Sequence, residues 1–191
     1  STPDDPSVPG MRSREKVIER GMGMFSSGGS PTHCSPTAGI CCVGNASNAI
    51  YYAWESILRV QDGSAQVNLM LNRTSSVLDV ESYLPYEPKV VLRNRSAKTV
   101  AVRIPGWVDR STLEYDINGT TVHPAWIGNY VLFTSLQDPD IITICFAERQ
   151  ETATYRVDPN WWHAYYTPYR PTFTEYLCHF RGDTCISVTS S

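Results

Sequence analysis

The sequence is poor in charged residues and has no long apolar run. Of its 191 residues only 18% are charged, and the formal net charge is −3. Lysine and arginine form no cluster, which excludes the basic surface that nucleic-acid binding requires. No apolar stretch approaches the ~20 residues of a transmembrane helix. These absences predict a globular protein that binds neither nucleic acid nor membrane.

Cysteine is too sparse and too unevenly spaced for a disulfide-dense secreted scaffold. Six cysteines occur, at positions 34, 41, 42, 145, 178 and 185. Cys178 and Cys185 flank a predicted hairpin, where they either form a disulfide or lie as unbonded neighbours. An initiator methionine is also missing, and the opening Ser1-Thr2-Pro3 is typical of a processed or excised piece. The lack of a targeting signal in this sequence therefore says little about where the protein is located.

The spacing of apolar residues changes once along the chain. Residues 1–40 are rich in Gly, Pro and Ser and predict loop, apart from a short helix at 12–20. Residues 46–60 predict the one convincing helix, with an aromatic stripe typical of a core-facing side and Asp62-Gly63 marking its end. From Gln66 onward the period changes to two. The predicted strands are 66–71, 77–80, 89–93, 99–104, 113–117, 130–134, 141–146, 153–157, 173–180 and 184–188.

Many short strands without intervening helices predict an antiparallel β-sandwich. Asn118-Gly119, between two such runs, is the strongest hairpin signal. We therefore expect a mainly β chain in two parts, a loop-rich stub with one helix at 1–62 and a β-sandwich at 63–191. Because a single amphipathic helix is stable only when it packs on a partner, the stub is expected to belong to a larger domain.

Two adjacent cysteines, Cys41 and Cys42, lie just before the predicted helix. Neighbouring thiols rarely bond to each other, because a disulfide needs well-separated Cα atoms and a specific torsion. The pair can be two ligands of a soft metal, a ligand beside a nucleophile, or two small buried side chains. A closed zinc site takes four ligands. Within the chain Cys34, His33 and Glu19 are the nearest further candidates, and otherwise ligands must come from outside it.

An aromatic cluster, Trp161-Trp162-His163-Ala164-Tyr165-Tyr166, could stack on sugar rings or form a buried patch. His33 is the histidine closest to the cysteine pair and is the best site candidate among the four. The string Arg181-Gly182-Asp183 suggests an adhesion signal, but the same residues suit a hairpin tip.

Four Asn-x-Ser/Thr glycosylation signals favour a secretory route. They begin at Asn45, Asn72, Asn94 and Asn118.

Four strings together resemble glycoside hydrolase family 127, the β-L-arabinofuranosidase type. The first is Cys41-Cys42-Val43-Gly44-Asn45, followed by an aromatic helix. The others are Arg103-Ile104-Pro105-Gly106-Trp107, Ile117-Asn118-Gly119 and Phe180-Arg181-Gly182-Asp183-Thr184. They occur in the order found in that family, and the resemblance runs from about Ser26 to the end of the chain.

The resemblance implies a catalytic (α/α)6 barrel followed by β-sandwich domains, with this chain holding the last barrel segment and the sandwich. It implies that Cys41 is the nucleophile and that Cys42, with Cys41, binds zinc. The acid/base Glu and the Glu-x-Cys zinc ligands of the family lie upstream of the cysteine pair, and residues 1–40 contain no equivalent. Val43-Gly44 and Asn48 also depart from the family's usual residues.

We therefore expect the C-terminal part of a zinc-dependent, cysteine-nucleophile glycoside hydrolase acting on L-arabinofuranosides or a related glycan, inactive alone. Its expected partners are a carbohydrate and an upstream barrel, with His33, Asn45, Trp161 and Trp162 as candidate substrate-binding residues. The alternative is a non-catalytic carbohydrate-binding or structural sandwich.

Overall fold

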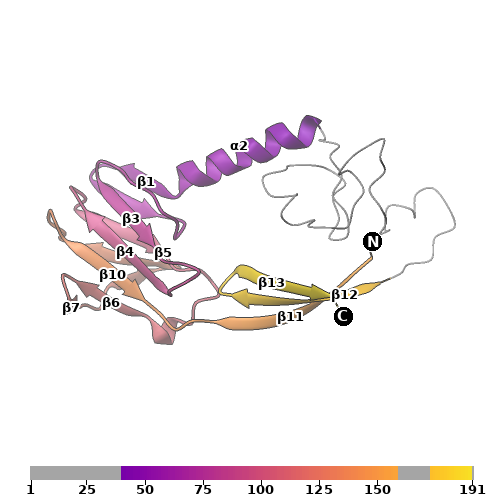
Figure 1. Ribbon diagram of the computed structural model, residues 1–191. Coiled ribbons are helices and arrows are strands. Elements are labelled where there is room, and N and C mark those ends of the chain that lie inside the picture. The colour runs from indigo at the N-terminus through magenta and orange to yellow at the C-terminus, as the bar shows by residue number, and fades with distance from the viewer. Residues whose placement is uncertain (1–39, 159–172, 191) are drawn as a thin grey trace. The chain divides into compact units, whose positions relative to one another are not determined.

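A computed structural model describes residues 40–158 and 173–190, with the backbone alone described at 40–44 and 190. Among these described residues, one α-helix, α2 (Ile40–Ser56), precedes the strands (Figure 1). The chain divides into two compact units, one of residues 53–153 and 178–188 and the other of residues 1–52, 154–177 and 189–191. Within the described residues, no helix combines the length and apolar character needed to span a bilayer.

The described strands form three sheets. The first has the order β1 (Leu58–Gln61), β2 (Ser64–Val67), β5 (Thr99–Arg103), β9 (Tyr130–Thr134) and β8 (Ala125–Ile127). The second has the order β3 (Leu78–Ser82), β4 (Lys89–Asn94), β10 (Ile141–Cys145), β6 (Glu114–Ile117) and β7 (Thr120–Thr121). The third consists of β11 (Gln150–Val157), β12 (Thr174–Arg181) and β13 (Thr184–Ser190). A short 3₁₀ helix, Arg110–Thr112, precedes β6.

The first two sheets pack face to face around one hydrophobic core. Buried side chains alternate along β5, β9 and β10, as expected for strands with a single core-facing side. Pairing of β10 with β4 sets Ile142 opposite Leu92 and Ile144 opposite Val90, and all four are fully buried. Val100, Val102 and Val131 of the other sheet belong to the same cluster. The predicted mainly β sandwich is therefore confirmed.

Pairing within the sandwich is antiparallel with one exception. Strands β2 and β5 run parallel, with Ala65 beside Val100 and Val67 beside Val102. The hairpin predicted at Asn118-Gly119 is confirmed. Both residues have positive φ, 53° and 77°, and they join β6 to β7 as a two-residue turn of the kind that suits twisted strands.

The predicted helix at 46–60 is wrong at both ends. The helix begins at Ile40 and ends at Ser56, and Leu58–Gln61 forms strand β1 instead. Asp62 and Gly63 have φ of 51° and 75°, and they connect β1 to β2 with Gln61 opposite Ser64. An Asp-Gly pair favours a tight hairpin turn as readily as it ends a helix, and here strand pairing decides between the two.

The remaining differences between the predicted and observed strands are differences in strand length. The strand predicted at 66–71 ends at Val67, and Leu71 is exposed. Short strands β7 and β8 carry too few alternating residues to be recognised in advance. The division into 1–62 and 63–191 stays a prediction, and the short helix at 12–20 lies outside the described residues.

Candidate functional site

Helix α2 contains the cysteine pair in its first turn. Because the helix begins at Ile40, the backbone of Cys41 and Cys42 is helical. Asn45 follows Cys41 by four residues, about one turn later, and its side chain is exposed. Of the four candidate substrate-binding residues, only Asn45 is placed, since His33, Trp161 and Trp162 lie outside the described residues.

The aromatic stripe of helix α2 is exposed. Ile50 and Tyr51 are each 55% exposed, and Trp54 is 50% exposed. Tyr52 is also exposed and meets Tyr51 edge to face, with 5.8 Å between ring centroids. The prediction that this stripe belongs to the core is therefore wrong for this chain, because only Ile57, just after the helix, enters the core cluster.

Two of the four strings meet in space. A Cβ atom added to Gly182 would lie 2.9 Å from Cη2 of the Trp107 ring, closer than side chains approach each other. Gly182 also has φ of 61°, a left-handed conformation that favours glycine, and its N–H donates to the Arg149 carbonyl at 2.8 Å. The turn between β12 and β13 is thus fixed against the loop that follows β5.

This packing helps to decide whether Arg181-Gly182-Asp183 is an adhesion signal or a hairpin tip. The Arg181 Nε atom lies 3.0 Å from a Glu148 carboxylate oxygen, and both side chains are about one-third exposed. Gly182 is covered by Trp107. These contacts favour the structural interpretation of the string as a packed hairpin tip.

A groove of about 420 Å³ lies beside this contact. Its walls are Asn68, Leu69, Met70, Leu71, Leu84, Pro85, Arg103, Pro105, Gly106, Trp107, Asp183 and Thr184. The lining contains one cation, one carboxylate and apolar walls. Retaining glycosidases require an acid and a nucleophile close together, and neither a carboxylate pair nor a thiol is among these lining residues. The described lining of this groove thus supplies neither a carboxylate pair nor a thiol for such catalysis.

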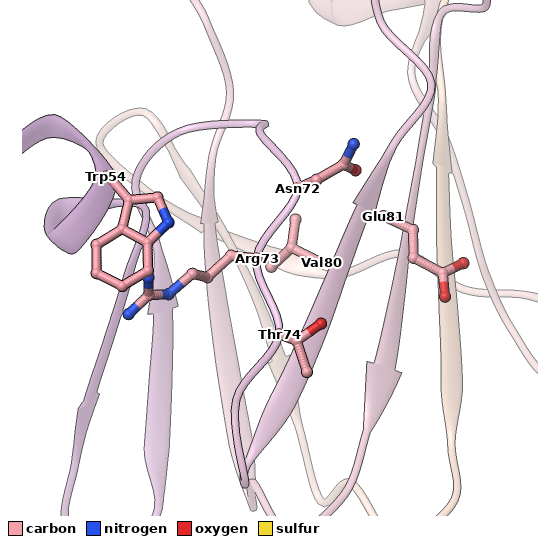
Figure 2. Close-up of a pocket in the computed structure, with 6 residues that line it drawn as sticks. All are labelled: Trp54, Asn72, Arg73, Thr74, Val80 and Glu81. Atoms are coloured by element: carbon pink, nitrogen blue, oxygen red, sulfur yellow. The ribbon is translucent and has the colours of Figure 1, made fainter. Parts of the chain in front are cut away.

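A second pocket, of about 400 Å³, lies where the segment before β3 approaches the end of helix α2. Figure 2 shows the Arg73 guanidinium next to the indole of Trp54, and the guanidinium carbon lies 3.3 Å from the ring centroid. Asn72, Thr74, Val80 and Glu81 complete its lining. A cation over an indole is a favourable arrangement, worth about 0.5–2 kcal/mol.

One charge pair of the sandwich includes a buried carboxylate and is structural. Arg95 donates from Nε and Nη2 to Oδ2 of buried Asp79, at 3.0 and 2.7 Å. The hydrogen bond from Arg95 holds the pKa of the Asp79 carboxyl below its usual value. Asp79 also accepts from the Ser75 N–H at 3.2 Å, so the carboxylate ties the approach to β3 to the loop after β4.

Two of the described thiols outside helix α2, Cys145 and Cys178, are poor nucleophiles. Cys145, Cys178 and Cys185 are free. Burial raises the pKa of Cys145 and, with the neighbouring Cys185, that of Cys178, so both remain protonated near neutral pH. The alternative of a disulfide between Cys178 and Cys185 is not observed. Among the described side chains, no group of three or more His, Cys, Asp or Glu could hold a metal ion.

Two contacts were not predicted from the sequence. Gly182 and Trp107 are 75 positions apart (182 − 107), and the sequence gives no sign that they are in contact. Each nevertheless lies in one of the four strings that resemble glycoside hydrolase family 127. Nothing in the sequence indicates the stacking of Arg73 on Trp54, because an arginine near a tryptophan is common and the contact depends on how the helix leads into β1.

Comparisons with known proteins support the fold. No family model matches the sequence, and no curated protein does. Among solved structures, a GH127 β-L-arabinofuranosidase from Geobacillus stearothermophilus T6 is similar over 81% of this chain, with 19% identity and a TM-score of 0.55. A second GH127 β-arabinofuranosidase is similar over 83% of this chain, with 16% identity and a TM-score of 0.53.

The chain spans about a quarter of the length of these two enzymes, 25% of the first and 27% of the second. At such low identity the likeness establishes the fold and not the activity. The resemblance to GH127 enzymes that the sequence suggested is thereby confirmed at the level of the fold: this chain folds as part of those glycoside hydrolases does.

Proposed function

We propose that this chain is the C-terminal part of a zinc-dependent glycoside hydrolase that acts on L-arabinofuranosides or a related glycan. The observation that carries the proposal is the fold shared with two GH127 enzymes over more than four-fifths of the chain. The Cys41-Cys42 pair at the start of helix α2 supplies the chemistry.

In this proposal the Cys41 thiolate attacks the anomeric carbon of the sugar, and a covalent glycosyl–sulfur intermediate forms. Water then releases the sugar from Cys41. A carboxylic acid must protonate the leaving oxygen in the first step. This acid would come from a preceding catalytic barrel. The exposed face of helix α2 would then pack within that barrel, which would account for the exposure of Tyr51, Tyr52 and Trp54.

The donor atoms of this cysteine pair suit zinc, but the pair supplies too few ligands for a complete zinc site. Two thiolates are soft ligands suited to zinc, yet they form half of a four-ligand site, and the described side chains provide no metal-binding cluster. Cys42, with Cys41, would hold the ion, and the other ligands would come from the preceding barrel. When bound, zinc would keep the sulfur deprotonated. Alone, the chain is expected to be inactive.

The test joins the chain to its preceding region and measures hydrolysis of an aryl L-arabinofuranoside. Cys41→Ser should lower kcat/KM by at least about 10³-fold, because it removes the nucleophile. Cys185→Ser is the matched control, since Cys185 is an exposed free thiol of the sandwich, and activity should be unchanged. Cys42→Ser should reduce bound zinc measured by elemental analysis. Full activity in the Cys41 variant would refute the assignment.

The alternative is a non-catalytic sandwich, either carbohydrate-binding or structural. A carbohydrate-binding sandwich predicts that the isolated chain binds arabinan oligosaccharides at micromolar to millimolar concentration in a titration. The proposed fragment without its barrel and a structural sandwich both predict no binding.

A further inference from the structure

We propose that Asn72 is an acceptor site for an N-linked glycan, and that the first sugar lies in the pocket of Figure 2. The asparagines of the four Asn-x-Ser/Thr signals differ in how the fold buries and hydrogen-bonds their side chains. An acceptor asparagine must keep its side-chain amide free of bonds that the glycan would break, and there must be space beside it.

Asn94 is incompatible with a glycan in the folded protein. Its side chain is 3% exposed, and Nδ2 donates to the carbonyls of Ala97 and Gln137 at 2.9 and 2.8 Å. Its Oδ1 accepts from the Ala97 N–H at 2.9 Å. A glycosylated amide retains a single N–H, so modification would remove one of these buried bonds and force a sugar into the core.

Asn118 is exposed, but its amide holds a turn. Nδ2 donates to Asp140 at 2.8 Å, and Oδ1 accepts from the Ile141 N–H at 2.9 Å. Asn118 also occupies the left-handed position of the tight turn between β6 and β7. Glycosylation would leave one N–H on Nδ2, so the bond to Asp140 would survive only with that N–H directed at the carboxylate, and the turn therefore restricts a sugar here. Asn45 lies one helical turn after Cys41, where a glycan would cover the proposed nucleophile, and its exclusion rests on the proposed function.

Asn72 is already arranged as an acceptor. Its Oδ1 accepts from the Ser82 N–H at 2.6 Å, which fixes the amide, while no described group accepts from Nδ2. Reciprocal hydrogen bonds between Arg73 and Val80, at 3.0 and 2.7 Å, hold the backbone beside β3. Attachment of a sugar to Nδ2 therefore leaves the one observed bond of this side chain intact.

The pocket beside Asn72 suits a first sugar. Its volume of about 400 Å³ lies within the roughly 300–1,000 Å³ typical of small-ligand sites. Thr74 offers a hydroxyl to the sugar, Glu81 offers the carboxylate oxygen that is not bonded to Arg93 Nε, and Val80 offers an apolar wall.

The modification is a group transfer from a lipid-diphosphate oligosaccharide. A bond forms between Asn72 Nδ2 and the anomeric carbon of the first sugar, and the bond from that carbon to the diphosphate oxygen breaks. The lipid diphosphate leaves with the electron pair, and one amide proton passes to the transferase.

The experiment secretes the whole 191-residue chain from yeast behind a cleavable leader and maps glycans by mass spectrometry. Enzymatic release of the glycan in heavy-oxygen water marks each occupied asparagine as a labelled aspartate. Thr74→Ala destroys the signal but leaves Asn72 and its bond to Ser82 in place, and Thr74→Ser preserves the signal as the matched control. Cooperative unfolding shows that each secreted variant is folded.

We expect a label at Asn72 and none at Asn94 in the folded protein. Thr74→Ala should lose the mass of one glycan, and Thr74→Ser should keep it. An unlabelled Asn72 in folded, secreted protein would overturn the inference, as would a label at Asn94. These readouts do not depend on hydrolase activity, so they can fail while the proposed function stands.

Discussion

The sandwich and helix α2 differ in how they use apolar side chains. In the sandwich, Leu92, Val100 and Ile142 are completely buried, and both sheets share one core. In the helix, Tyr52 is 63% exposed and three neighbouring apolar residues are at least half exposed. A helix of this length gains most of its stability from packing. The sandwich is therefore equipped to be stable by itself, whereas the helix carries a surface suited to a partner.

Truncation of a core residue should reveal this difference most strongly. Leu92→Ala leaves a cavity at a fully buried position, and the free energy of unfolding should fall by about 2–5 kcal/mol. The matched helix variant, Ile50→Ala, removes a side chain that is 55% exposed, and the change should stay within about 0.5 kcal/mol. Urea unfolding of the two variants measures both values. Equal losses would contradict the assignment of the core to the sandwich alone.

A pair of glycines tests whether the β12–β13 turn is fixed to the sandwich. Gly182→Ala combines a left-handed φ of 61° with a contact of 2.9 Å to Trp107, and it should destabilise by about 1–3 kcal/mol. Gly119→Ala shares the left-handed φ, 77°, but meets no atom within 4 Å, so it should cost about 1 kcal/mol.

The additional loss of stability in Gly182→Ala relative to Gly119→Ala, measured by thermal or urea unfolding, reports the packing against Trp107. Replacing Trp107 by Leu in the Gly182→Ala background should recover part of that excess, because a smaller side chain relieves the contact. No recovery would mean that the backbone conformation alone accounts for the loss.

The pH dependence of stability should show the smallest effect. Because Arg95 lowers the pKa of Asp79 in the folded state, the pair stabilises the fold above the unfolded carboxyl pKa of about 3.9. This contribution is lost as the pH falls through the lowered pKa. Asp79→Asn should therefore flatten the fall in stability below about pH 4, as measured by urea unfolding across pH. Glu114→Gln, at an exposed site, should follow the unmodified protein.

Much of the fold could be predicted because its signals are local. Alternation along Tyr130–Thr134 and Ile141–Cys145 predicted strands β9 and β10 closely, and Asn118-Gly119 marked its turn. Strand β1 was missed because Leu58 and Val60 continue the helical spacing of the residues before them. Only pairing with β2 assigns them to a sheet, and pairing is not visible in a short window.

The candidate site was less predictable because it depends on contacts between distant residues. Gly182 has no room for a side chain because it packs against Trp107. The amide of Asn94 is held by a hydrogen bond to the carbonyl of Gln137, 43 residues away. For the proposed catalytic pair, the sequence shows the residues themselves but not their partners. Cys41 and Cys42 are evident as neighbours in the sequence, but the groups that would complete their chemistry are not supplied by the described residues.

The order of the strands has a consequence for how the chain folds. The first sheet takes β1, β2, β5, β8 and β9, and the second takes β3, β4, β6, β7 and β10, so successive strands repeatedly change sheet. Neither layer can assemble from one continuous stretch, and the parallel pair β2–β5 closes only after β3 and β4 have been synthesised. Because such long-range closure is entropically slow, refolding is expected on the millisecond-to-second scale of non-local β proteins.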